Sequence, residues 1–464
     1  MPSSITRPPG FSDRQKRLAL VAQGTGTSTE SSSPRGSRTT EEFRVSASAP
    51  TSVIVIGGGI GGFASALVLR RLGADVQLLE QAPEFAEAGA GLQMSPNATR
   101  LLERWGLLDQ AIASGVAPGR VVFRDATTGE DLLDQDVNGE FRERYGAPYI
   151  VAHRADLHRL LWKTAEAEGV RLFNDVRIES VDNTPGGARA VAADGREFTA
   201  DAIVAADGIK SSVRKQLFSD DEPVASEYVA YRGAIPTERA SHSKDMDAVV
   251  VWLGPECHLV QYPLRGGELF NTVAVYRSES FAAGQLTYTG DDELRAAYTE
   301  CVPKVRDALD NVDDAMRWPM FDRVPISRWH EGRICLVGDA AHPMLQYLAQ
   351  GACQALEDAG TLEHLAGELV LGAGGDPSRW PEVFERFTEL RREKTAKVQN
   401  TARTWGEAWH LTGPVERTVR NMLFRSADRH GIWEYTDWLY GEQPADGRVS
   451  ADGQAAEAFP ATAP

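Results

Sequence analysis

The chain reads Val-Ile-Val-Ile-Gly-Gly-Gly-Ile-Gly-Gly from Val53 to Gly62. Four apolar residues predict a buried strand, and the glycines followed by the apolar stretch 63–72 predict a turn and a helix. Gly57, Gly59 and Gly62 occupy the glycine positions of the pattern G-x-G-x-x-G, which supply a tight turn, close approach to a pyrophosphate and close helix–strand packing. The stretch therefore predicts a dinucleotide site at the helix N-terminus, where free N–H groups favour anions.

An acidic residue follows at the distance that this kind of site needs. Residues 75–80 predict a second strand, and Glu80 ends it, 23 residues after Gly57. A carboxylate there can accept hydrogen bonds from a ribose and disfavours a 2′-phosphate. The pattern favours FAD or NAD over NADP and leaves the choice between those two open.

Bulk composition narrows the class of protein. With 464 residues, 42% of them hydrophobic, the chain can bury a large core and is expected to hold two domains. The net charge of −17 argues against nucleic acid and anionic membranes as partners, though not against a small anionic substrate. No apolar run is long enough for a transmembrane helix. The four cysteines lack metal-site spacing, so we expect reduced thiols, no metal site and a cytoplasmic location.

Both ends of the chain lack apolar periodicity. Residues 1–48 contain a Gly/Ser/Thr-rich tract and are expected to be a disordered tail, as are residues 442–464. A basic, serine-rich N-terminus is also compatible with a transit peptide, but we favour a dispensable tail.

Two more buried strands end in acidic turns. Residues 202–206 lead into Asp207-Gly208, and residues 333–337 lead into Gly338-Asp339. Ligands of open α/β sheets bind at the carboxyl ends of strands, so Gly57, Asp207 and Asp339 are predicted to share one site. Between these motifs we expect a small meander at 121–136 and antiparallel strands at 170–174, 178–182 and 189–193.

A different pattern occupies residues 228–322. Strands are predicted at 248–253, 258–263 and 271–276, joined by glycine turns, as in an antiparallel sheet domain inserted into a dinucleotide-binding domain. Alternation places His258, Val260 and Tyr262 on one sheet face, which alone favours a partly exposed face over a pocket. The expected parts are the dinucleotide-binding residues 49–227 and 323–375, the inserted sheet 228–322 and the C-terminal helices 376–441.

Together these motifs resemble the class A FAD-dependent aromatic hydroxylases, in particular the 3-hydroxybenzoate 6-hydroxylases. The resemblance rests on Gly57–Gly62 with Glu80, on the run Asp207–Arg214 and on Gly338–Pro343. Further stretches narrow it, namely Tyr231-Arg232-Gly233, 257–267, 345–351 and the late motifs 405–411 and 435–439. It implies an α/β, Rossmann-like FAD-binding domain of the glutathione-reductase type, an inserted antiparallel-sheet substrate domain and a C-terminal helical region.

The resemblance also implies roles in binding FAD. Glu80 would hold the adenosine ribose, and Arg154 the flavin side of the diphosphate or the ribityl chain. The Asp207-Gly208 run would serve both FAD and the transient NAD(P)H. Asp339 would bind the ribityl hydroxyls, and Gly338 beside it would belong to the FAD-binding residues. The helix after Pro343, with Gly351, would point its N-terminus at the isoalloxazine.

The implied reaction is the conversion of 3-hydroxybenzoate to gentisate in a homodimer. Tightly bound FAD would be reduced by NADH and react with O2 through a flavin C4a-hydroperoxide. His258 and Gln346 would contact or deprotonate the substrate hydroxyl, a task that suits histidine because its pKa lies near neutrality. Tyr262 would position the aromatic acid.

Three alternatives stay open. One is a salicylate 1-hydroxylase or another phenol hydroxylase of the same class. Another is a flavin dehydrogenase or oxidase that inserts no oxygen, and the last is a flavin-binding protein without activity.

Overall fold

A six-stranded sheet carries the glycine motif, in the order β18-β19-β12-β1-β2-β8. The computed structural model describes residues 50–85, 91–218, 221–240, 245–286, 291–373, 375–427 and 429–441. The sheet comprises β1 Ser52–Ile56, β2 Asp75–Leu79, β8 Arg171–Phe173, β12 Ala202–Ala205, β18 His330–Glu331 and β19 Ile334–Leu336. All neighbours are parallel except the edge strand β18. The predicted Rossmann-like α/β fold is therefore confirmed.

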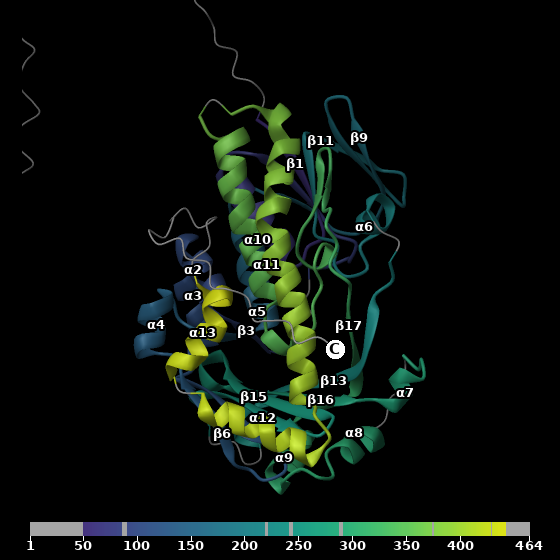
Figure 1. Ribbon diagram of the computed structural model, residues 1–464. Coiled ribbons are helices and arrows are strands. Elements are labelled where there is room, and N and C mark those ends of the chain that lie inside the picture. Colours follow the sequence, from purple (N-terminus) through teal and green to yellow (C-terminus); the bar gives the residue numbers. More distant parts are fainter. Residues whose placement is uncertain are drawn as a thin grey trace, which may run out of the picture. The chain divides into compact units, whose positions relative to one another are not determined.

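Helices cover this sheet and bury its apolar strands. The glycine turn opens α1 (Ile60–Arg71), whose residues 62–69 are all buried. Nearby lie α5 (Arg154–Ala167) and the long helices α10 (Gly351–Ala366) and α11 (Trp380–Trp409), which Figure 1 shows side by side. The helices α2 Pro96–Arg104, α3 Leu108–Ala113, α4 Gly139–Tyr145 and α6 Ser212–Leu217 complete this half.

The second large sheet has seven strands, in the order β17-β13-β16-β15-β14-β5-β6. Its strands are β5 Arg120–Asp125, β6 Asp131–Asp136, β13 Val224–Pro236, β14 Ala248–Gly254, β15 Cys257–Leu264, β16 Leu269–Arg277 and β17 Asp313–Asp322. The short helices α7 Glu279–Ala282, α8 Asp291–Ala297 and α9 Pro303–Asp307 follow β16. The sequence predicted the inserted sheet but not that β5 and β6 belong to it.

Of the predicted strands, one pair is part of a larger sheet than expected, and one strand has the wrong predicted direction. The expected meander at 121–136 is present as the antiparallel pair β5 and β6, but β5 also pairs in parallel with β14, so the seven-stranded sheet includes strands from the first part of the chain. Of the antiparallel strands expected at 170–174, 178–182 and 189–193, the last two do pair antiparallel, but β8 pairs in parallel with β2. In both cases, local alternation predicts a strand but leaves its partner undetermined.

Two small sheets and two helices complete the described chain. One sheet contains β9 Ile178–Thr184, β10 Gly187–Ala192 and β11 Glu197–Ala200, and the other β3 Gly91–Met94, β4 Gly115–Val116 and β7 Ile150–His153. After α11 come α12 (Pro414–Ser426) and α13 (Arg429–Tyr440), and α12 contacts β6 of the seven-stranded sheet. In Figure 1, α12 and α13 are the yellow helices near this sheet.

The chain divides into Met1–Ser48 and Ala49–Pro464, and only the second unit is described here. The disordered tails predicted for 1–48 and 442–464 lie outside the described residues. Among the helices that the structure describes, none combines the length and the apolar character needed to cross a membrane.

Candidate functional site

The β1–α1 turn leaves no room for a side chain at Gly57 or Gly62. Gly57 has a φ of +102°, and a Cβ there would lie 2.3 Å from the carbonyl oxygen of Ala206. A Cβ at Gly62 would lie 1.9 Å from the carbonyl oxygen of Gly57. Gly59 caps α1 and offers no side-chain hydrogen bond, so the first N–H groups of the helix remain available to a ligand.

Glu80 lies against this turn. Its carboxylate accepts hydrogen bonds from the backbone N–H of Gly58 (2.6 Å) and of Ala82 (2.7 Å). Because a carboxylate has about four lone-pair positions, acceptor capacity remains for a ribose hydroxyl. The structure thus brings Glu80 and the glycine turn together, as the sequence predicted.

The other two acidic turns lie at the same sheet edge. β12 lies between β1 and β19, so Asp207 and Gly338 follow neighbouring strands. The Arg214 guanidinium joins the two motifs by donating to the Ala341 carbonyl (2.9 Å). Asp207 Oδ1 is buried without a hydrogen-bond partner among the described residues, and burial raises the pKa of this carboxyl. Asp339 is exposed.

The helix predicted after Pro343 is α10, which is separated from Pro343 by irregular chain and one 3-10 turn. Residues 341–345 are irregular, η5 (Gln346–Leu348) is a single 3-10 turn, and α10 begins at Gly351. Pro343 does not line the cavity described next, and its carbonyl accepts a hydrogen bond from Gln399 (2.9 Å). The helix N-terminus that faces open space is that of α10, since Gly351 and Ala352 line the cavity described next.

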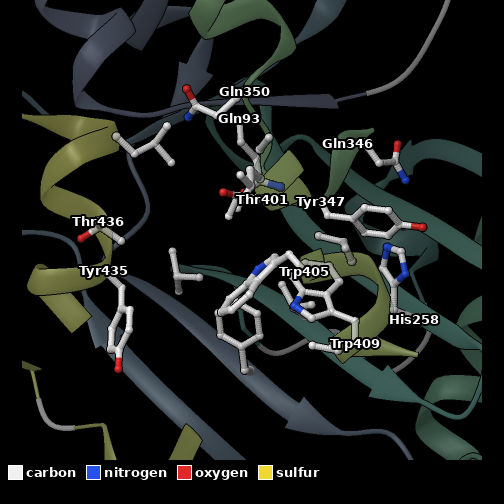
Figure 2. Close-up of a pocket in the computed structure, with 18 of the residues that line it drawn as sticks. Gln93, His258, Gln346, Tyr347, Gln350, Thr401, Trp405, Trp409, Tyr435 and Thr436 are labelled. Atoms are coloured by element: carbon white, nitrogen blue, oxygen red, sulfur yellow. The ribbon is translucent and has the colours of Figure 1, made fainter. Parts of the chain in front are cut away.

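One large cavity of about 2370 Å³ lies between the two halves of this unit. Arg154, Asp339 and Gly351 line it next to the six-stranded sheet, and His258, Tyr262 and Gln346 line it next to the seven-stranded sheet. Figure 2 shows His258, Tyr347 and Gln346 at one end, and Tyr435 and Thr436 of α13 at the other. The glycine turn, Glu80, Asp207, Gly208, Gly338 and Pro343 lie outside its lining.

His258 and Tyr262 project from the central strand β15. Every residue of β15 is buried, so the partly exposed face that alternation favoured is wrong; the face of His258, Val260 and Tyr262 is a cavity wall. Desolvation lowers the pKa of His258 to about 3 and raises the pKa of Tyr262. Both side chains are therefore neutral near pH 7 before any ligand binds.

Gln346 is held by a residue to which the sequence assigned no role. Arg232 of β13 donates from Nη2 to Gln346 Oε1 (2.7 Å), and its positive charge offsets part of the rise that burial causes in the pKa of Tyr262. Arg232 Nε is buried without a partner among the described residues. The stretch Tyr231-Arg232-Gly233 was noticed in the sequence, but its contact with residue 346 requires the folded chain.

His410 is the second residue without a predicted role. It follows α11, and its Nε2 lies 2.7 Å from Nδ1 of His258. Its ring stacks on Tyr228, with centroids 4.2 Å apart. Its motif, 405–411, was the only signal available in the sequence.

These features fit the FAD that the sequence implies. The turn without side chains and Glu80 suit the adenosine and diphosphate end. Arg154, Asp339 and the α10 N-terminus border the cavity that the other end would enter. The aromatic side chains Tyr149, Tyr347, Trp405 and Trp409 line the same cavity and suit a planar aromatic ligand.

Comparisons with known proteins agree with this arrangement. The family described as FAD binding domain matches residues 50–378. A 3-hydroxybenzoate 6-hydroxylase from Polaromonas naphthalenivorans is 38% identical over 84% of this chain and 95% of its own length. The enzyme of the same name from Klebsiella oxytoca is 36% identical over 84% of this chain and 96% of its own length.

Solved structures are similar as well. A salicylate hydroxylase in complex with substrate has a TM-score of 0.71 and 26% identity, covering 85% of this chain and 96% of its own. Klebsiella pneumoniae HpxO with FAD and uric acid has a TM-score of 0.73 at 23% identity, covering 84% of this chain and 97% of its own, which shows a shared fold.

Proposed function

Because the chain belongs to the FAD-binding-domain family and is a flavoprotein monooxygenase, we propose that it converts 3-hydroxybenzoate to gentisate. The proposed reductant is NADH and the oxygen source is O2. The observation that carries the proposal is the cavity wall formed by His258, Tyr262 and Gln346, opposite the dinucleotide side marked by Asp339 and Gly351. When bound there, FAD would supply an electrophilic oxygen.

The chain's own residues orient and activate the ring. His258 and Gln346 would contact or deprotonate the substrate hydroxyl, and Tyr262 would position the ring. A hydroxyl at ring position 3 directs attack to position 6, which is para to it. Arg232 brings a positive charge to the same wall and favours an anionic ring, since an opposite charge stabilises an ionised group. The apolar and aromatic lining limits access of water.

The cofactor side follows from the same geometry. We propose that Gly57, Gly59, Gly62 and Glu80 hold the adenosine and diphosphate end, and that Asp207, Gly208, Gly338, Asp339 and Arg154 hold the middle of FAD. The substrate-binding part would comprise residues 228–322 together with β5 and β6. The cofactor-binding part would comprise residues 323–375 and the rest of 49–227. The four free, buried cysteines support the cytoplasmic location expected from the sequence.

We also propose that the protein is a homodimer. Val415, Val419, Met422 and Leu423 lie on one face of α12 and are exposed, with Leu423 65% exposed. Apolar side chains at this spacing form a stripe that water solvates poorly. A second copy of the chain would cover it.

The test is turnover with a panel of aromatic acids. NADH consumption is followed with 3-hydroxybenzoate, salicylate, 4-hydroxybenzoate and 3-amino-4-hydroxybenzoate, and products are identified by chromatography. The expected result is gentisate from 3-hydroxybenzoate in a one-to-one ratio with NADH. Catechol from salicylate would favour the salicylate hydroxylase alternative. NADH oxidation that yields hydrogen peroxide and no hydroxylated product with any acid would overturn the proposal.

A further inference from the structure

Two histidines far apart in sequence share one short hydrogen bond at the cavity wall. His258 lies on β15 and His410 follows α11, and Nδ1 of the first is 2.7 Å from Nε2 of the second. Both are buried, with 1% and 4% of their surfaces exposed. Their backbones are fixed too, because the Tyr298 hydroxyl donates to the His258 carbonyl (2.6 Å) and Glu256 N–H donates to the His410 carbonyl (3.1 Å).

Both rings are neutral in this environment. Burial lowers the pKa of His258 and of His410, and the charge of Arg420 on α12 lowers the pKa of His410 further. Among the residues that the structure describes, the other titratable side chains in ring contact with the pair are Tyr228, stacked on His410, and Tyr347, which contacts both rings. None of these groups supplies a negative charge that would stabilise an imidazolium.

Two neutral imidazoles at this distance share one proton, and there are two ways to place it. In one, His410 donates from Nε2, so His258 accepts at Nδ1 and carries its own proton on Nε2. In the other, His258 donates from Nδ1, so its Nε2 is a free base and His410 carries its proton on Nδ1. The two arrangements give His258 opposite roles toward a ligand.

The surroundings of His410 Nδ1, the ring nitrogen that does not face His258, distinguish the two proton arrangements. His410 Nδ1 is buried and has no hydrogen-bond partner among the described residues. A buried N–H without an acceptor costs about 1–3 kcal/mol, and such orphaned donors are rarer in proteins than acceptors with a spare lone pair. The favoured arrangement therefore leaves a lone pair on His410 Nδ1 and places the His410 proton in the shared bond.

We propose that His410 fixes the proton of His258 on Nε2, so that His258 meets the substrate as a hydrogen-bond donor and holds it as a phenolate. Nε2 is the nitrogen left to the cavity, which His258 lines. This inference rests on the proposed function and decides between contact and deprotonation. The phenolic proton then leaves to solvent as substrate binds, instead of passing to His258. His410 is a positioning residue, since it acts through His258.

Two measurements on the FAD-loaded enzyme test this inference. Nitrogen-15 NMR of histidine-labelled enzyme without substrate should show Nε2 of His258 protonated and Nδ1 as an acceptor, with the signals assigned from His258→Asn. Calorimetry of 3-hydroxybenzoate binding, in buffers of different ionisation enthalpy below the pKa of the free phenol, should show release of roughly one proton per site. A proton on His258 Nδ1, or binding without proton release, would overturn the inference.

Variants of His410 separate positioning from packing. In His410→Gln the amide can still donate to His258 Nδ1, so the NMR signature and proton release should persist. In His410→Glu an ionised carboxylate can only accept, so His258 Nδ1 should become protonated and lose its acceptor signal. An unchanged signature in His410→Glu would contradict the positioning role. Gentisate formation by the same wild-type preparation tests the proposed function separately, because the NMR measurement uses no substrate.

Discussion

The absence of a Cβ atom at Gly62 is necessary for the predicted cofactor site. A Cβ there would overlap the Gly57 carbonyl, which is backbone and cannot rotate away. By contrast, Gly186 in the β9–β10 turn has no atom within 4 Å of the equivalent position. The two glycines therefore make a matched pair for substitution by alanine.

We expect Gly62→Ala to lose FAD and to be less stable than wild type by at least about 2 kcal/mol, because helix α1 must move away from β1. Gly186→Ala should keep both properties. Flavin absorbance of the purified proteins and urea denaturation measure them. Full flavin content in Gly62→Ala would show that the turn tolerates a side chain and is not the diphosphate site.

Helices α10 and α11 are joined by a buried ionic network behind the Gly338-Asp339 turn. Asp358 of α10 accepts hydrogen bonds from Gly338 N–H (2.8 Å), His342 Nε2 (2.7 Å) and Arg391 Nε of α11 (2.8 Å). Arg391 also pairs with Glu357, which Lys394 contacts at 2.8 Å. The network fixes the turn that presents Asp339 to the cavity.

We expect Arg391→Met to destabilise the protein by about 3–5 kcal/mol, since it removes the buried cation that both buried carboxylates share. The control is Arg386→Met on the same helix, which removes a pair with Glu368 that is half exposed on both sides, and it should change stability little. Thermal and urea unfolding give both values. Equal stability of the two variants would contradict the role assigned to the network.

The same network predicts how stability depends on pH. Burial alone would raise the pKa of Asp358, but His342, Arg391 and the Gly338 N–H hold it below the ordinary 3.8, and Lys394 and Arg391 likewise lower the pKa of Glu357. A carboxyl whose pKa is lower in the folded than in the unfolded state stabilises the fold at pH values above its unfolded-state pKa. This stabilisation is lost as the pH falls through the lower, folded-state pKa. The acid-induced loss should be smaller in Arg391→Met than in wild type.

Segments from distant parts of the chain together form the wall of the cavity. β5 and β6 come from the first part, β13 to β16 from the insertion, and α11 to α13 from the C-terminal part. The exposed apolar face of α12 borders the same cavity, since Val415, Val419 and Leu423 also line it. Assembly and the cavity are therefore expected to be linked.

We expect Leu423→Glu to convert the proposed homodimer to a monomer, because a charge in an apolar interface stays unpaired and desolvated on association. Val324→Glu is the matched control: Val324 is 55% exposed but lies outside α12, and its substitution should leave assembly unchanged. Sedimentation velocity at several concentrations distinguishes the outcomes. A wild-type monomer, or a Leu423→Glu dimer, would exclude α12 as the interface.

Local sequence pattern was enough for the parts of this protein that depend on neighbouring residues. The spacing of Gly57, Gly59 and Gly62 predicted a turn without side chains, and Glu80 was predicted to face it. Short-range sterics and strand periodicity control both features, so they can be read without the fold. The family resemblance then implied FAD and an aromatic acid, which no local pattern could supply.

Other features depended on how distant segments pack. The Arg232–Gln346 contact joins residues 114 apart, and the His258–His410 bond joins residues 152 apart. The parallel pairing of β5 with β14, the buried face of His258 and Tyr262, and the start of α10 at Gly351 likewise follow from the packed chain. Sequence alone supplied the chemical groups of the site, but the proton of His258 depends on a partner that only folding brings within hydrogen-bond distance.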